Sequence, residues 1–170
     1  MDRHRTILGG RPDQEPGRWK TATNRVGAYD FVAPELVEGT LHKGLALVSG
    51  IPPGIGRALY IMFVVLEVHP FGDGNGRVAR VMMNAELSAA GAARIVIPSV
   101  YRDEYLSGLR RASLNDGDAD GLVRVMTYAW RWTAAMPWAD RAAVEGQLEA
   151  TNALQDPITA READLRLELP

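Results

Sequence analysis

The sequence predicts an all-α fold, a single helical-bundle domain of about six to eight helices that carries one small β-hairpin. Apolar residues recur at helical spacing through most of the chain, and glycines and prolines separate these stretches from one another. Only residues 21–33 combine strand-forming Val, Tyr and Phe with turn-forming Asn and Gly. Because no second long strand pattern lies nearby, we expect a hairpin or flap here and not the core of a sheet.

Five helices are expected before residue 137, each ended by a glycine, a proline or a polar turn. Their approximate bounds are residues 34–48, 53–68, 75–89, 99–114 and 120–136. The second of them is apolar nearly all round, which is typical of a helix at the centre of a bundle. A turn is expected at residues 115–118, and one or two further helices within residues 139–169.

The composition is that of a globular domain large enough to bury a core. Hydrophobic residues make up 46% of the 170 residues, charged residues make up 24%, and the net charge is −2. This balance provides no basic field for nucleic acid, and the absence of cysteine excludes disulfides and thiolate metal sites. The longest apolar run has eight residues, whereas a membrane span needs about 20. With no secretory signal visible, we expect a soluble cytoplasmic protein that binds neither nucleic acid nor membrane.

The segment HPFGDGNGRVAR, which begins at residue 69, carries the features of a phosphate site. It lies between the apolar helix and the start of the next one, where four backbone N–H groups lack intrahelical partners. Gly74 and Gly76 flank Asn75, so the backbone can approach an anion closely. Arg77 and Arg80 are three residues apart on one helix face, and their guanidinium groups match phosphate oxygens. Together these features indicate a site for more than one phosphate.

Two further residues of this segment suggest chemistry. Asp73 stands at the helix start, where a single carboxylate among phosphates is a typical magnesium arrangement. His69 is the group suited to accept a proton near neutral pH. Taken singly, each feature has an ordinary explanation, because such a histidine is often a packed cap, an aspartate before a helix an N-cap, and Gly-Asn-Gly a turn. Their occurrence in order within twelve residues favours the polyphosphate site, with Phe71 as an anchor in the core.

The same segment resembles the signature His-x-Phe-x-(Asp/Glu)-Gly-Asn-Gly-Arg-x-x-Arg of the Fic-domain nucleotidyl transferases at every fixed position. The resemblance extends from about residue 18 to residue 136 and includes the flap-like stretch NRVGAYDFVAPELV upstream. It implies a Fic-like core domain over residues 18–136. A polar, loosely ordered arm, residues 1–17, would precede this core, and C-terminal helices in residues 137–170 would pack on it.

What the resemblance implies is the transfer of AMP from ATP to a Ser, Thr or Tyr hydroxyl of a target protein. His69 would accept the hydroxyl proton, Asp73 would bind Mg²⁺, and Phe71 would anchor the loop. The flap would dock the target by strand addition, and the adenine would lie between the flap and the fourth helix. The phosphates would be bound by Gly74, Asn75, Gly76, Arg77 and Arg80. The flap candidates are Val26, Tyr29 and Phe31, and the adenine candidates are Leu106 and Ser113.

The resemblance leaves other activities open. Gly76 stands where the related death-on-curing kinases carry Lys, which favours adenylylation over phosphorylation. Removal of AMP, transfer of another nucleotide or phosphate-containing group, and non-catalytic nucleotide binding are the alternatives. Many relatives carry an inhibitory helix with the motif (Ser/Thr)-x-x-x-Glu-(Gly/Asn), which this chain does not match. Glu145, which precedes a glycine, is the candidate inhibitor within the chain. Otherwise the inhibitory helix would belong to a longer parent chain or to a separate antitoxin that acts in trans, or would be absent.

Overall fold

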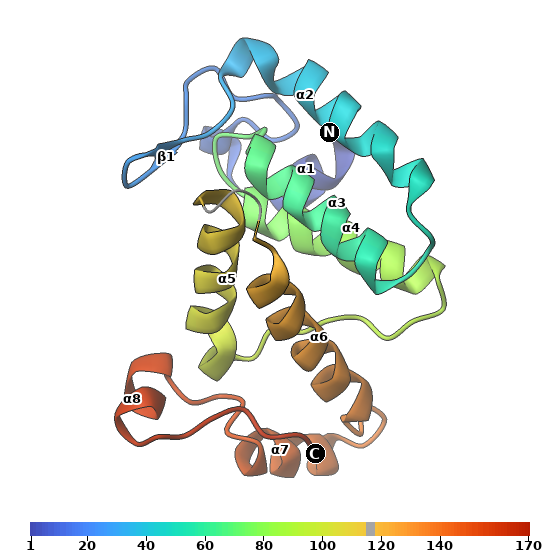
Figure 1. The fold of residues 1–170 in the computed structure, drawn as a ribbon, viewed down its shortest axis with the longest axis vertical. Helices are drawn as coiled ribbons and strands as arrows, with labels where there is room; N and C mark the ends of the chain where they lie inside the picture. The colour runs from blue at the N-terminus through green and yellow to red at the C-terminus, as the bar shows by residue number, and fades with distance from the viewer. Residues whose placement is uncertain (115–117) are drawn as a thin grey trace. The chain divides into compact units, whose positions relative to one another are not determined.

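The computed structural model describes residues 1–114 and 118–170, which form two compact units, residues 1–92 and residues 93–170 (Figure 1). Eight α-helices, four short 3-10 helices and one two-stranded hairpin make up the regular structure of the described residues, which confirms the predicted all-α fold. Most of the predicted turn at residues 115–118 lies outside the described residues. None of the helices in the described ranges has the length and hydropathy needed to cross a membrane.

The first unit is built around two long helices, α3 and α4, which pack side by side (Figure 1). Helix α3 is apolar on almost every face, and an ion pair between Arg57 of α3 and Glu86 of α4 (2.6 Å) joins the two helices. Helix α2 packs on α3 so closely that a Cβ on Gly44 would lie 2.8 Å from the Val64 side chain. The helices of this unit are α1 (Asp2–Ile7), α2 (Val37–Ala46), α3 (Ile55–Val68) and α4 (Asn75–Ala89).

The predicted hairpin is present and short. Strand β1 (Arg25–Val26) pairs antiparallel with β2 (Tyr29–Asp30), so that Arg25 faces Asp30 and Val26 faces Tyr29. Gly27 has a φ of 60° in the connecting turn, a conformation that glycine adopts without steric cost. The hairpin therefore forms a flap beside the helices and not the core of a sheet.

The N-terminal residues depart from the prediction. A loosely ordered arm was expected from the glycines and prolines of residues 1–17, and this expectation is wrong. Residues 2–7 form α1, and both His4 and Leu8 are only 1% exposed. Leu8 packs against the backbone of Gly74, so burial of an apolar side chain and not local propensity orders the segment.

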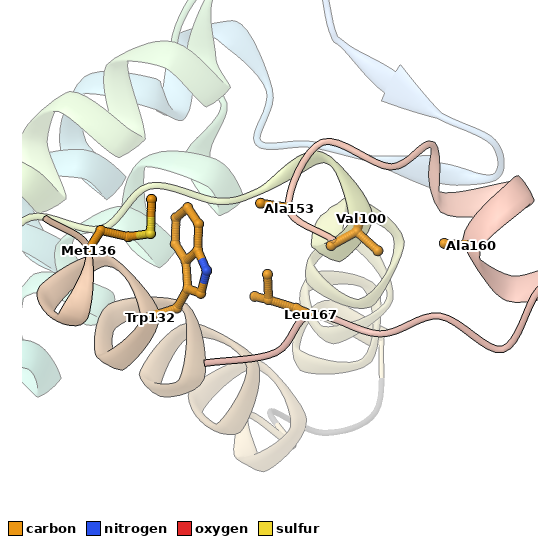
Figure 2. Close-up of a cluster of buried hydrophobic side chains, with 6 residues drawn as sticks. All are labelled: Val100, Trp132, Met136, Ala153, Ala160 and Leu167. Atoms are coloured by element: carbon orange, nitrogen blue, oxygen red, sulfur yellow. The ribbon is translucent and has the colours of Figure 1, made fainter. Parts of the chain in front are cut away.

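The second unit is organised around Trp132. The indole is 1% exposed and lies among side chains that come from both ends of the unit (Figure 2). Its Nε1 donates a hydrogen bond to the Thr151 hydroxyl (3.1 Å), which satisfies the polar atom of the buried ring. The helices are α5 (Arg102–Leu114), α6 (Asp120–Ala135), α7 (Arg141–Ala150) and α8 (Pro157–Glu162). The buried cluster comprises Val100, Trp132, Met136, Ala153, Ala160 and Leu167.

Candidate functional site

The segment HPFGDGNGRVAR lies where the chain leaves α3 and enters α4, and its backbone turns sharply at two positions. His69 follows α3 with a φ of 49°, and Gly74 precedes α4 with a φ of 79°. A side chain in this left-handed region costs about 1 kcal/mol or more, so His69 is held there by its surroundings. The Val78 N–H bonds to the Gly74 carbonyl (3.0 Å), so the N–H groups of residues 75–77 precede the first hydrogen bond of α4.

The hydrogen bond of the His69 ring defines its protonation. Nδ1 lies 3.1 Å from the Leu66 carbonyl, and because a carbonyl can only accept, Nδ1 carries the proton and Nε2 keeps a lone pair. Burial lowers the pKa of His69; the Leu66 bond and the Glu67 carboxylate raise it, and the Lys20 ammonium lowers it. The net shift is downward, so the neutral ring predominates at pH 7. His69 is therefore in the protonation state that a general base needs.

Asn75 uses its whole side chain to hold the loop in place. The amide is 2% exposed, and its Oδ1 accepts a hydrogen bond from the Phe71 N–H (2.9 Å). Its Nδ2 donates to the Phe71 carbonyl (2.8 Å). Phe71 itself is 3% exposed and stacks between the rings of His4 (3.7 Å) and Trp19 (5.2 Å). The side chain is thus buried within the loop, and it is the backbone N–H of Asn75 that faces the helix start as a donor for an anion.

Asp73 and Arg77 meet at the opening of the loop. One carboxylate oxygen of Asp73 accepts the Gly74 N–H (2.6 Å), and the other accepts a hydrogen bond from the Arg77 guanidinium (3.0 Å). The two side chains are 45% and 47% exposed. An ion pair this exposed is worth about 0.2–1 kcal/mol, so an incoming phosphate can exchange with it at little cost.

Arg80 lies over the first turn of α4. Its guanidinium comes within 3.3 Å of the point that a Cβ on Gly76 would occupy. The missing side chain at Gly76 therefore leaves room for the arginine beside the first N–H groups of the helix. Two guanidinium groups and the helix start together form a positively polarised end of α4, as anion binding requires.

The flap contacts the histidine directly. The ring of Phe31 stacks on His69 with a centroid distance of 3.9 Å and an angle of 19°. The Tyr29 hydroxyl donates to the Glu67 carboxylate (2.8 Å), and burial together with this bond raises the pKa of Tyr29 to about 12. Val26 is 56% exposed on the neighbouring strand. The hairpin is thus tied to the end of α3 through its second strand.

The match that assigns the family covers this whole site. Residues 1–87, half of the chain, match the Fic/DOC family. The chain belongs to the Fic/DOC family. The family resemblance drawn from the twelve-residue segment is thereby confirmed.

Relatives of known name support the same family. The chain is 34% identical over 121 residues to "Protein adenylyltransferase fic-1" of Caenorhabditis elegans, covering 68% of this chain and 24% of that protein. It is 39% identical over 131 residues to "Protein adenylyltransferase Fic" of Drosophila persimilis, covering 73% of this chain and 25% of that protein. This Fic chain thus spans about a quarter of the length of these relatives.

Solved structures share the fold. Fic-1 from Caenorhabditis elegans superposes with a TM-score of 0.65 at 28% identity, covering 89% of this chain and 42% of that one. A Fic domain containing signaling protein from Bacteroides thetaiotaomicron superposes with a TM-score of 0.60 at 22% identity, over 85% of this chain and 61% of that one. At 22% identity, the similarity to the Bacteroides protein concerns the fold alone.

The residues at this loop fit a magnesium ion that is bound together with phosphates. Among residues 1–114 and 118–170, no three His, Asp or Glu side chains cluster closely enough to hold a metal by themselves. The Asp73 carboxylate is half exposed, and each oxygen that already accepts one hydrogen bond retains a second lone pair. Magnesium is commonly held by one or two carboxylates together with phosphates and waters. Asp73 therefore suits the role of the one protein ligand.

Three predicted residues lie in the second unit of the Fic chain. Leu106 and Ser113 are half-buried on α5, where the Ser113 hydroxyl donates to the Leu109 carbonyl (3.0 Å). Glu145 on α7 pairs with Arg141 one turn earlier (2.8 Å). Their assignments to the adenine and to inhibition stay predictions.

The sequence did not predict that two further residues, Lys20 and His4, contact the loop. Lys20 is 5% exposed, its N–H donates to the Pro70 carbonyl (2.9 Å), and its buried Nζ has no hydrogen-bond partner within the described ranges. Burial lowers the pKa of Lys20. His4 donates to the Asp73 carbonyl. No sequence signal identifies either contact, because Lys20 and His4 lie about 50 or more residues from their partners and belong to no motif.

Proposed function

We propose that this chain is the catalytic part of a protein adenylyltransferase, which transfers AMP from ATP to a Ser, Thr or Tyr hydroxyl of a target protein. The relatives' names point to this reaction class. The observation that carries the proposal is the state of His69. The Leu66 carbonyl can only accept, so it holds the proton on Nδ1, and burial, which lowers the pKa of the ring, favours the neutral form with its lone pair on Nε2.

His69 acts as the general base in the proposed reaction. The target hydroxyl gives its proton to Nε2 while its oxygen forms a bond to the α-phosphorus of ATP. The bond from that phosphorus to the bridging oxygen of the β-phosphate breaks, and pyrophosphate leaves with the electron pair. A positioned base of this kind contributes about 10²- to 10⁴-fold to the rate.

The start of α4 binds the phosphates. Gly74, Asn75 and Gly76 form the anion site: the backbone N–H groups of Asn75 and Gly76 line it, and Gly74, whose own N–H donates to Asp73, supplies the left-handed turn before them. Arg77 binds the phosphates on the leaving side, and Arg80 binds the γ-phosphate. Asp73 would hold Mg²⁺, which when bound supplies neutralisation of the phosphate charge. The exposed pair between Asp73 and Arg77 exchanges for these contacts when the nucleotide enters. Such a site works by positioning and charge stabilisation, as phosphoryl-type transfer requires.

The flap receives the target. A two-stranded hairpin has free outer edges, and an extended peptide can add to such an edge as a further strand. Tyr29 and Phe31 tie this hairpin to Glu67 and to the ring of His69. Val26 offers an exposed apolar side chain to the docked segment. The partner is therefore a protein with an accessible hydroxyl residue in an extended segment. Regulation by an antitoxin or an inhibitory helix in trans belongs to the same proposal.

The test is labelling of proteins with ATP that carries the label in its α-phosphate. The chain is incubated with Mg²⁺, labelled ATP and a cell extract, and products are identified by intact-mass spectrometry. We expect AMP adducts that His69→Ala abolishes. His42→Ala is the matched control, because His42 is an exposed histidine on α2 and should leave labelling unchanged.

A donor panel separates the proposed reaction from its alternatives. CTP, GTP, UTP and CDP-choline are offered in place of ATP under the same conditions. AMP adducts as the dominant product support the proposal. A dominant adduct from another donor, or labelling that survives His69→Ala, would contradict the donor or the base, respectively.

A further inference from the structure

His4 contacts the phosphate loop from the N-terminal helix α1. The ring is 1% exposed, and Nδ1 accepts a hydrogen bond from the Gly17 N–H (2.8 Å). Nε2 lies 3.0 Å from the Asp73 carbonyl oxygen. An amide N–H can only donate and a carbonyl can only accept, so one neutral form, with the proton on Nε2, satisfies both neighbours. Both ring nitrogens of this buried histidine are therefore used.

The same ring holds the loop at a second point. His4 stacks face to face on Phe71 with a centroid distance of 3.7 Å and an angle of 3°. Phe71 and Asp73 are separated only by Gly72, so one side chain sets both ends of a three-residue turn. Just beyond it, Leu8 packs where a Cβ on Gly74 would be 3.2 Å from its Cδ1. The N-terminal segment thus contacts the loop at Phe71, Asp73 and Gly74.

The contact with the Asp73 carbonyl has a geometric consequence for the outer side of the loop. The C=O and N–H of a trans peptide point in opposite directions. When the Asp73 carbonyl points to His4, the Gly74 N–H in the same peptide points away from α1. There it donates to the Asp73 carboxylate (2.6 Å), whose other oxygen pairs with Arg77. The orientation of that one peptide therefore decides where the carboxylate and the guanidinium lie.

We propose that His4 is a positioning residue of the phosphate site, which orients the Asp73–Gly74 peptide and through it the Asp73 carboxylate and Arg77. This inference rests on the proposed function, since it assigns a support to the same nucleotide site. His4 does not touch the reacting atoms; it acts through the loop.

Two matched substitutions separate the two hydrogen bonds. In His4→Gln the side-chain amide can still donate to the Asp73 carbonyl, as Nε2 does. In His4→Asn the shorter amide can accept from Gly17 but cannot reach Asp73. Both variants lose the stack on Phe71, so packing is matched between them.

The measurements are the affinity for ATP in the presence of Mg²⁺, AMP transfer, the melting temperature and the backbone amide shift of Gly74. We expect His4→Asn to weaken ATP binding at least about tenfold and to move the Gly74 shift, while His4→Gln stays within about threefold of wild type. Melting temperatures should be similar in the two variants, because each keeps one of the two bonds. A purely structural role predicts losses that follow the melting temperature, and that result would overturn the proposal.

The wild-type protein provides a readout that needs no variant. Nitrogen-15 NMR of the His4 ring should show the form protonated at Nε2, and protonation at Nδ1 would overturn the proposal even if both variants fail to fold.

The binding and transfer measurements together separate the role of His4 from the proposed reaction. If ATP binding depends on His4 but no AMP is transferred, the role of His4 stands and the proposed reaction is rejected. If AMP transfer is unchanged in His4→Asn, the reaction stands and the role of His4 is rejected. A wild-type protein that does not bind ATP would reject both proposals.

Discussion

Replacing Asn75 with alanine tests whether the side chain supports the loop or serves the anion. The substitution removes two buried hydrogen bonds, to the N–H and the carbonyl of Phe71. The Phe71 carbonyl keeps a second donor, the Asn24 amide at 3.2 Å, but the Phe71 N–H loses its acceptor, Oδ1 of Asn75. An unsatisfied buried N–H costs about 1–3 kcal/mol, and the net loss of the other bond about 1 kcal/mol. We therefore expect Asn75→Ala to lower the free energy of unfolding by about 2–4 kcal/mol.

The assay combines thermal unfolding by circular dichroism with hydrogen exchange of the Phe71 amide. For a chain of this size, a loss of about 3 kcal/mol lowers the melting temperature by about 6–12 °C. The Phe71 amide should exchange faster, because it donates to Asn75 in the native loop. Asn24→Ala is the matched control: it removes a partly exposed donor to the Phe71 and Gly72 carbonyls, leaves no buried N–H without a partner, and should cost about 1 kcal/mol.

A second substitution at the same position, Asn75→Asp, should make the stability depend on pH. Asn75→Asp keeps an acceptor for the Phe71 N–H but turns an oxygen toward the Phe71 carbonyl. The introduced carboxyl must be protonated to bond there, so burial raises its pKa in the folded state above the value of about 4 in the unfolded chain. Its contribution to stability is present at low pH and is lost as the pH rises through the folded pKa. A melting temperature within about 1 °C of wild type for Asn75→Ala, or the same deficit at all pH values for Asn75→Asp, would refute the reasoning.

Three further predictions concern the base and the packing of α2. The rate of AMP transfer should fall as the pH drops through the pKa of His69, which lies below 6.5, because protonation removes the Nε2 lone pair; a pH–rate profile with an acid limb above 6.5 would contradict this. Lys20→Met removes a positive charge near His69, so NMR titration should give a higher pKa for that ring; an unchanged pKa would show that the ammonium exerts no field there. Gly44→Ala forces a Cβ to 2.8 Å from the Val64 side chain and should cost about 1–3 kcal/mol in urea unfolding, whereas Gly39→Ala on the same helix meets nothing within 4 Å and should not destabilise. Equal midpoints for these two alanine variants would refute the close packing.

Where sequence and structure agree, the relevant contacts are local. Helices α2 to α6 begin and end within a few residues of their predicted bounds, because their apolar spacing and terminal glycines act over single turns. The loop from His69 to Arg80 was also predictable as a unit. The ion pair between Asp73 and Arg77 spans one helical turn, and the hydrogen bonds between Asn75 and Phe71 span four residues.

Where they differ, the partner is distant in the chain. The N-terminal residues have the composition of a loose arm, yet Leu8 and His4 are buried against the loop. Composition measures local propensity, whereas order in this segment comes from apolar burial and from a bond across 69 residues. The same holds for Lys20, an ordinary residue in the sequence that becomes a buried charge beside His69.

By itself the sequence determined the class of the fold and the contiguous set of groups that can bind phosphates, since neighbours along a helix end are neighbours in space. Only the tertiary structure decided the burial that lowers the pKa of His69, whose ring the flap residue Phe31 covers, and the orientation of the loop, through His4. These depend on desolvation and on contacts between separate segments, which arise only when the folded chain brings those segments together.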